Sequence, residues 1–521
     1  MNATLQLVRL ALRRDRLLLP AWILTFVVMA AGSAAATVPL FPTESSRILA
    51  ANGMNAMPSL VALYGKIYDP TSVGALAIIK MGGLGAALVA VFAIVVMVRH
   101  TRADEQAGRL ELVGATPVGR HAPLAAAVLV ALGANVVLAV LTASGLIAAG
   151  LPVEGSIVFG LAWASVGLAF SGIAAVVSQL TRSARAAVGL SSMVLGVVYV
   201  LRAIADAAQP EWLTWLSPIG WGQQFRPYAG NRWWVLLITV GFAAAAAALA
   251  HALAVRRDLG AGLLADREGP ATAAPSLRSP LALAWRLQRG PLLAWAASFL
   301  LLGLVFGNIS STVGEFFDAQ GARELITALG GTSRLTDAFL SFELSMTGVI
   351  ASVYGVQAAM RLRGEENELL LAAPVGRARY ALSHLTIAVL GCALLMALMG
   401  LGAGIAHGAQ IGDPGQTWRL LGAALVQLPA AWVLVGITTV VFGAAPRVLA
   451  GVWAVLLAFV LLGELGPLLK LDPWVMDLSP FAHTPKLPGA AMEVAPPVVL
   501  TGIALMAVLA GVTAFRRRDL G

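Results

Sequence analysis

Residues 124–150 read LAAAVLVALGANVVLAVLTASGLIAAG, a run in which no side chain carries a charge. A helix that crosses the hydrocarbon core of a bilayer needs about 20 mainly apolar residues, so this run is long enough to cross. Similar runs recur along the chain, bounded by arginine, proline and glycine. We predict twelve spans, at residues 18–37, 73–98, 124–150, 156–180, 187–205, 235–255, 292–308, 338–360, 380–407, 420–443, 448–468 and 495–515.

The composition supports this interpretation. The chain has 521 residues, of which 59% are hydrophobic and 12% are charged. A soluble domain is roughly 45–50% apolar and about 25% charged. A water-soluble globule is therefore excluded, and we predict an all-α polytopic membrane protein in the plasma membrane.

Basic residues indicate the orientation. With a cytoplasmic amino terminus, the inner segments hold 24 of the 35 basic residues, although the outer loops are longer in total. Positive charge gathers on the cytoplasmic side of membrane proteins, so both termini are predicted to be cytoplasmic. The cations lie between apolar runs rather than on one water-facing surface, which argues against nucleic acid as the partner behind the net charge of +9.

An internal repeat divides the chain into two halves. RRDLG ends the first half at Arg256–Gly260 and recurs at Arg517–Gly521, and PVGR at Pro117–Arg120 recurs at Pro374–Arg377. We predict two six-span halves, residues 1–260 and 281–521, joined by a cytoplasmic linker at 261–280. Six crossings is an even number, so the two repeats are parallel and form a pseudo-dimer with a path between the halves.

A short acidic hairpin recurs between the second and third spans of each half. It reads RADEQAGRLELVGATPVGR from Arg102 and RGEENELLLAAPVGR from Arg363. Such a helix can dock into a basic groove on a partner; alternatively, it is a solvated loop whose acids pair with neighbouring arginines. The candidate docking residues are Asp104, Glu105, Glu111, Glu365, Glu366 and Glu368.

The loop after the fifth span of each half contains a second candidate. Tryptophan favours the membrane interface, and proline and glycine interrupt regular structure here, so the segment either forms a re-entrant hairpin in the outer leaflet or anchors at the interface. The hairpin candidates are Trp215, Ser217, Pro218, Trp221, Ser479 and Pro480.

Two ionisable residues lie at nearly equal depth in corresponding spans. Lys80 is in the second span and Glu343 in the eighth. Intramembrane charges are costly and usually paired, so we predict that they face each other across the two halves; the alternative is that each reaches outward or meets another partner.

The sequence lacks the residues that several kinds of chemistry require. A phosphate-binding loop needs G-x-x-x-x-G-K-[ST], and none of the four lysines is followed by Ser or Thr. The chain is therefore not predicted to be an enzyme and has no cofactor of its own. The six histidines are scattered and Cys392 is the only cysteine, so we predict no metal site and no disulfide.

With the acidic hairpins, the RRDLG endings, WLSPIGWGQQFRPYAGNRWW at Trp215–Trp234 and APSLRSP at 274–280, the chain resembles the fused twelve-span permeases of type-two ATP-binding cassette exporters. These are the actinobacterial antibiotic or multidrug exporters. The resemblance implies two copies of a separate ATPase subunit that binds ATP and Mg, with the acidic hairpins as coupling helices. It also implies outward movement of hydrophobic or amphipathic small molecules, whose identity stays open.

The rival interpretation is a proton-coupled carrier of the major facilitator type. GLLADREG at Gly262–Gly269 matches part of that superfamily's loop signature, but it lies between the halves rather than after the second span. An ATPase-dependent exporter permease is therefore the expected function.

Overall fold

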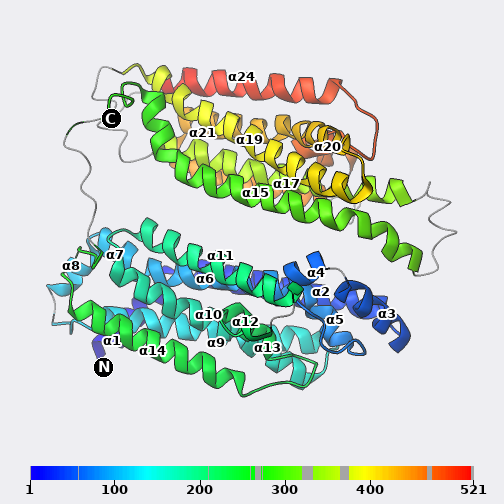
Figure 1. Cartoon of the computed structure of the whole chain (residues 1–521). Coiled ribbons are helices and arrows are strands. Elements are labelled where there is room, and N and C mark those ends of the chain that lie inside the picture. The colour runs from blue at the N-terminus through cyan, green and yellow to red at the C-terminus, as the bar shows by residue number, and fades with distance from the viewer. Residues whose placement is uncertain are drawn as a thin grey trace. The chain divides into compact units, whose positions relative to one another are not determined.

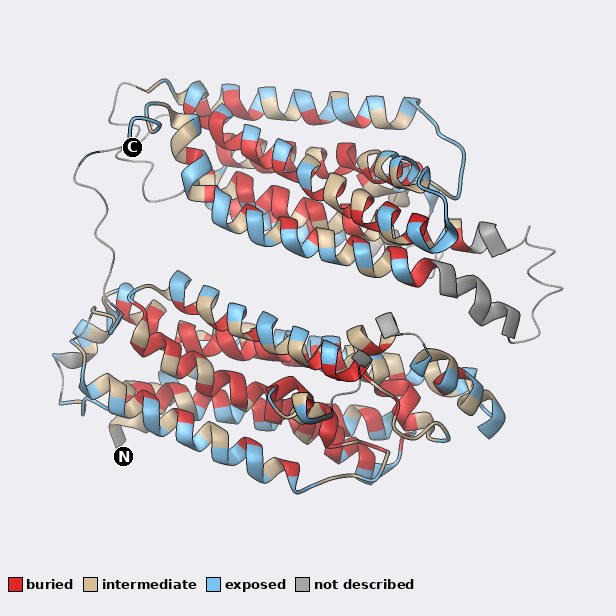
Figure 2. Cartoon of the chain, viewed as in Figure 1, coloured by how far each residue is buried: buried red, intermediate tan, exposed pale blue. Residues whose placement is uncertain are grey.

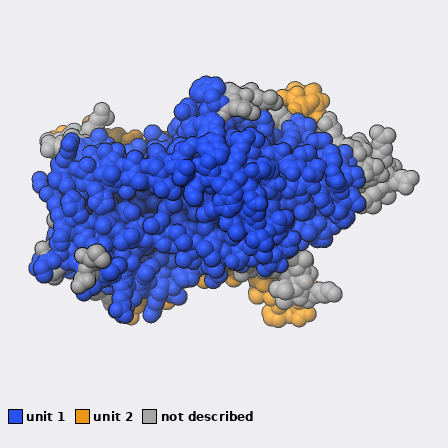
Figure 3. All heavy atoms as spheres, turned by 90° about the horizontal axis from the view of Figure 1, so that it is seen from below, with its two compact units in different colours: residues 1–269 blue, residues 270–521 orange. Residues whose placement is uncertain are grey.

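The structure is a computed structural model of the chain. It describes residues 2–56, 58–115, 117–208, 211–258, 260–264, 272, 274–319, 332–363, 375–465 and 472–517. The chain divides into two compact units, Met1–Gly269 and Pro270–Gly521, which Figure 3 colours separately. Each unit has hydrophobic clusters of its own.

The described part of unit 1 consists of helices, turns and loops without a strand (Figure 1). Its helices are α1 (Asn2–Arg14), α2 (Leu18–Thr37), η1 (Val38–Leu40), α3 (Glu44–Asn55), α4 (Pro58–Tyr64), α5 (Val73–Lys80), η2 (Met81–Gly85), α6 (Ala86–Arg99), α7 (Arg102–Gln106), α8 (Arg109–Gly114), α9 (Ala122–Ala148), α10 (Val153–Leu180), α11 (Ala184–Ala208), α12 (Glu211–Thr214), α13 (Pro218–Gln224) and α14 (Val235–Val255).

Unit 2 is helical in the same way over its described residues. Its helices are α15 (Pro280–Ala319), α17 (Thr332–Met360), η3 (Arg361–Arg363), α19 (Arg377–Ile411), α20 (Gln416–Leu425), α21 (Leu428–Ala444), η4 (Pro446–Gly451), α22 (Val452–Leu465), α23 (Pro473–Met476), η5 (Pro480–His483) and α24 (Ala495–Arg517).

Eleven of the predicted spans are confirmed as helices of membrane-crossing length. Within the described residues, 11 helical segments are long and apolar enough to cross a bilayer. The span predicted at 448–468 corresponds to α22, which is described over only 14 residues. The chain is therefore a multi-pass α-helical membrane protein, while a twelfth crossing stays a prediction.

Apolar side chains cover the outer faces of the spans as well as the inner ones. On α9, Val136 and Val140 are exposed while Leu138 is buried. In a soluble protein such a surface would be an association site. In a bilayer it faces lipid, and the helical backbone satisfies its own hydrogen bonds there.

Helix α10 is the centre of unit 1. It packs against α6, α9, α14 and α13, and it is buried along most of its length (Figure 2). Small residues allow this close packing, because a Cβ added to Gly160 would run into the carbonyl of Ala139 on α9.

Helix α19 has the corresponding place in unit 2, where it packs against α15, α17 and α20. A Cβ on Gly402 would lie only 2.8 Å from the carbonyl oxygen of Leu300 on α15. The two helix backbones approach closely because that Cβ is missing.

The second span of unit 1 is interrupted by a π-bulge. Helix α5 joins α6 through η2, which is a π-helical segment of five residues. The indole Nε1 of Trp163 on α10 donates to the Met81 carbonyl of the bulge at 3.0 Å. Bulges of this kind leave carbonyls without their usual helical partners and occur often at functional sites.

Candidate functional site

The acidic hairpin of unit 1 forms two short helices rather than one. Helix α7 ends at Gln106, and α8 begins at Arg109 after Gly108, whose φ of +70° is in the left-handed region. Glycine adopts this conformation without the steric cost that a Cβ imposes. The turn separates the three candidate carboxylates into two groups with different surroundings.

Glu105 on α7 is buried at the centre of an ion-pair network. Its side chain is only 5% exposed, and its two carboxylate oxygens accept from Arg257 Nη1 at 2.6 Å and Nη2 at 2.9 Å. Arg102 lies 3.0 Å away, and the backbone N–H of Gly260 donates at 2.6 Å. Arg257 also donates from Nε to Gln179 on α10 at 2.8 Å. Glu105 therefore ties α7 to the segment after α14 and to the core helix.

Asp104 belongs to a neighbouring network that includes α1. It accepts from Arg14 and, at 2.7 Å, from Arg109. Asp15, which follows Arg14 in the chain, has a fully buried side chain. It pairs with Arg99 at 2.9 Å and with His100 at 2.8 Å. These contacts join the amino-terminal helix to the end of α6 and to α7.

Glu111 on α8 is exposed, and so is its neighbour Leu112. Behind α8 is a cavity of about 430 Å³, lined by Leu110, Val113 and Leu124 and by the polar residues Glu105 and Arg257. Helix α8 therefore covers a space rather than a close-packed core. The corresponding acids of the second hairpin, Glu365, Glu366 and Glu368, lie outside the described residues.

The repeated PVGR motif makes the same kind of contact within each unit. Arg120 Nη2 donates to the carbonyls of Val255 and Arg257, each at 3.0 Å. Arg377 Nη1 donates to the carbonyl of Arg516 at 3.3 Å. A cation placed on the last carbonyls of a helix offsets their partial negative charge, so each arginine holds the end of the last helix of its unit.

The tryptophan-rich segment of unit 1 forms the short helices α12 and α13, and the re-entrant hairpin stays a prediction. Ser217 caps α13 by accepting from the N–H of Gly220, and Pro218 occupies the first turn. Trp221 Nε1 donates to the Trp215 carbonyl at 2.6 Å, and the Trp215 ring stacks on that of Trp234 with centroids 5.4 Å apart. In unit 2, Ser479 is buried and donates to the Phe459 carbonyl, and Pro480 begins η5.

Close to α13, α11 carries a buried ion pair. Arg202 is fully buried; its Nη1 lies 3.2 Å from Asp206 Oδ2, and its Nη2 donates to the Ala62 carbonyl at the end of α4. The amide of Gln223, oriented so that both ends meet complementary partners, accepts from Arg202 at 2.9 Å and donates to Asp206 at 3.0 Å. This triad fastens α4 and α13 to α11.

A comparison of the whole chain with known proteins identifies its family. The family model described as "Multidrug efflux system permease Rv1217c, C-terminal domain" matches residues 6–254 and 277–516. The multidrug efflux system permease protein Rv1217c of Mycobacterium tuberculosis is 42% identical over 526 residues, covering 100% of this chain and 95% of that protein. The chain belongs to this multidrug efflux permease family.

Sequence reasoning did not find two of the permease's buried ion pairs, Glu105 with Arg257 and Arg202 with Asp206. Arg257 lies inside the first RRDLG motif, so the repeat marked it, but its partner Glu105 is far away in the chain. The signal for the second pair was an arginine and an aspartate four residues apart within an apolar run, at positions 202 and 206. That spacing places both side chains on one helix face.

The predicted pairing of two intramembrane charges would connect the two units of the permease. Lys80 is exposed at the start of the π-bulge, and Glu343 is half-buried on α17. They belong to different units, so their pairing stays a prediction. Within the described residues, no group of three or more metal-ligating side chains is found.

Proposed function

We propose that this chain is the permease subunit of an ATP-binding cassette exporter, which moves hydrophobic or amphipathic compounds out of the cell. The main support is the 42% identity over the whole chain to a multidrug efflux system permease. The eleven membrane-length helices among the described residues are the kind of element that forms the transport path in such a protein. ATP and Mg are bound by a separate ATPase subunit.

The proposal includes two copies of that ATPase, one for each half of a twelve-helix pseudo-dimer. Its halves are residues 1–260 and 281–521, with the linker at 261–280. Support comes from the family match in two stretches, 6–254 and 277–516. Arg120 and Arg377 make corresponding contacts with the last helix of their own units, and this similarity also supports two equivalent halves.

In this mechanism, α7 and α8 transmit motion from the ATPase to the spans. Exposed Glu111 meets the ATPase surface, and α8 has room to shift because a cavity lies behind it. Asp104 and Glu105 transmit the displacement instead of touching the partner, since their ion pairs reach α1, α10 and the end of α14.

The proposal is tested with inside-out vesicles that contain the chain alone or together with its ATPase. We expect the chain alone to hydrolyse no ATP above the background of empty vesicles. With the ATPase, a fluorescent amphipathic dye should accumulate on addition of ATP, and a protonophore should not prevent this. Dye uptake by the chain alone, driven by a proton gradient, would instead establish a secondary carrier.

Orientation can be tested separately because Cys392, the only cysteine, is fully buried. In a Cys392→Ala background we expect Trp212→Cys to react with a membrane-impermeant maleimide on intact cells. Arg185→Cys, at the other end of α11, should react only after permeabilisation. Labelling in the reverse order would contradict the proposal that both termini are cytoplasmic.

A further inference from the structure

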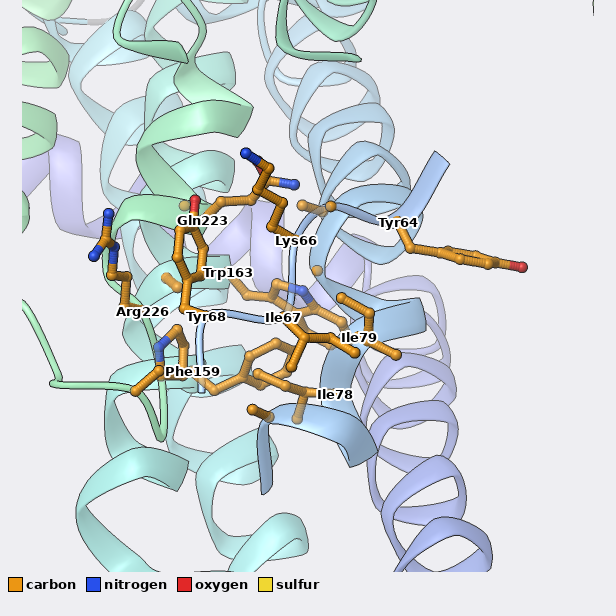
Figure 4. Close-up of a pocket in the computed structure, with 18 residues that line it drawn as sticks. Tyr64, Lys66, Ile67, Tyr68, Ile78, Ile79, Phe159, Trp163, Gln223 and Arg226 are labelled. Atoms are coloured by element: carbon orange, nitrogen blue, oxygen red, sulfur yellow. The ribbon is translucent and has the colours of Figure 1, made fainter. Parts of the chain in front are cut away.

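A small cavity lies beside α13 in unit 1, and no part of the proposed coupling mechanism uses it. Its volume is about 50 Å³. A single water needs roughly 10–15 Å³ on this measure, so the cavity has room for a few waters or one small polar group. Phe159 and Trp163 of α10 and Ile78 and Ile79 of α5 form its apolar wall (Figure 4).

Two cations line the same cavity, Lys66 and Arg226. Both are half-buried, and no carboxylate lies within ion-pair distance of either among the described residues. The nearby carboxylate of Asp206 is already held by Arg202 and Gln223. The lining therefore has an excess of positive charge in an environment where isolated charge is costly.

Arg226 also has a hydrogen-bond donor without an acceptor. Its guanidinium stacks on the ring of Tyr68 at 4.3 Å, but its Nε is buried without a hydrogen-bond partner in the described structure. Buried N–H groups nearly always have an acceptor, and one on a cation attracts an anionic acceptor most strongly.

The backbone that holds Arg226 is strained. Its φ is +47°, and Tyr228 and Asn231 also have positive φ values. The loop is kept in this conformation because Asn231 Oδ1 accepts from the N–H of Tyr228 at 3.0 Å and the Tyr228 hydroxyl lies 2.8 Å from Ser156 Oγ. Burial raises the pKa of Tyr228 to about 12, so the phenol stays neutral. Such strain persists where the surroundings enforce it and clusters at binding sites.

The buried ion pair of α11 holds the backbone that precedes Lys66. Arg202 donates to the carbonyls of Ala62 and Leu63, and the hydroxyl of Tyr199 donates to Leu63 at 2.7 Å. These bonds fix the end of α4, immediately before the segment that carries Lys66. Arg202 is thus a positioning residue for the cavity.

We infer that this cavity binds the oxyanion group, carboxylate, sulfonate or phosphate, of an amphipathic cargo molecule whose apolar body stays outside the cavity, because the space holds only one small polar group. Lys66 and Arg226 supply the positive charge, and the unpaired Nε of Arg226 supplies a donor. The assignment of the ligand as cargo rests on the proposed function, whereas the anion site itself does not.

The test uses two probes with the same rings but different charge. 8-Anilino-1-naphthalenesulfonate carries a sulfonate, and N-phenyl-1-naphthylamine is neutral. The full chain is placed in phosphatidylcholine nanodiscs, and binding is followed by energy transfer from tryptophan, with empty nanodiscs as the blank. Neither ATP nor the ATPase is present, so a failure of the proposed exporter function cannot imitate a failure of the site.

We expect Lys66→Met and Arg226→Met each to weaken sulfonate binding roughly tenfold, the loss of one charge-assisted contact, while the neutral probe binds within about twofold of the unmodified chain. Arg226→Lys should retain part of the affinity. Arg185→Met removes an exposed cation at the other end of α11 and should change neither probe.

Unchanged sulfonate binding in both methionine variants would overturn the inference, and so would an equal loss of both probes, which would indicate a packing role. A lipid headgroup is the other source of an oxyanion. If phosphatidylglycerol added to the nanodiscs displaces the sulfonate probe from the unmodified chain, the site belongs to lipid and the cargo assignment is wrong.

Discussion

Glu105 illustrates how one carboxylate can organise the end of a membrane domain. It is buried with Arg102 and Arg257, so two positive charges surround one negative charge. A buried ion pair is not necessarily more stable than an apolar replacement, but removing one member leaves a charge without compensation. We therefore expect loss of the Glu105 carboxylate to destabilise the fold strongly. Loss of an exposed coupling carboxylate should cost little stability.

This difference predicts the behaviour of two matched variants. Glu105→Lys places a third cation beside Arg102 and Arg257, and we expect it to lower the free energy of unfolding by about 3–5 kcal/mol. Glu111→Lys makes the same charge change at an exposed position and should alter stability by less than about 0.5 kcal/mol. Thermal unfolding of the two purified variants in detergent provides the measurement.

The two variants also separate structure from coupling. Under the proposed mechanism, Glu111→Lys stays folded and loses dye-stimulated ATP hydrolysis in the complex with the ATPase. Equal stability of Glu105→Lys and the unmodified chain would contradict the buried network, and full stimulation in Glu111→Lys would contradict the docking role of α8.

Among the helices, the π-bulge η2 is the element that gives the second span its particular shape. It lies where the carbonyls at the end of α4 approach the span. A Cβ on Gly83 would be 2.6 Å from the Leu63 carbonyl oxygen and 2.9 Å from that of Tyr64. The missing side chain thus allows α4 to reach the span and the loop after α4 to line the cavity.

Substitution of this glycine tests the element. Gly83→Ala forces backbone atoms apart, and we expect a cost of about 1–3 kcal/mol, the usual range for overpacking. The control is Gly133→Ala on α9, where an added Cβ meets nothing within 4 Å. Since alanine favours a helix over glycine by roughly 0.5–1 kcal/mol, the control should be neutral or stabilising. Similar melting temperatures for the two variants would show that the bulge does not need a glycine.

For the whole molecule, the main feature is that each unit has its own core. The largest hydrophobic cluster of unit 1 uses residues from Leu19 to Ala250, and that of unit 2 uses residues from Leu292 to Phe515. Among the described residues, the two clusters share no residue, so each unit has a hydrophobic core of its own. Units of this kind are expected to fold independently.

Separate expression checks this independence. We expect the fragments 1–269 and 270–521, each produced alone, to insert into membranes and to unfold cooperatively in detergent. Cooperative loss of tryptophan fluorescence is a suitable readout because both fragments contain buried or half-buried indoles, such as Trp163 and Trp432. Degradation or non-cooperative melting of either fragment would show that its core is incomplete without the other.

The sequence alone determined the fold class and eleven of the membrane-crossing helices. This is possible because a bilayer demands long apolar runs with internally satisfied backbones, and such runs are visible in one dimension. The tertiary structure decided which polar residues act together. Glu105 meets Arg257, and Lys66 lines a cavity with Arg226, although the members of these pairs are 152 and 160 residues apart in the chain. Neither hydropathy nor spacing encodes such pairings, because they arise only when helices distant in the chain pack side by side.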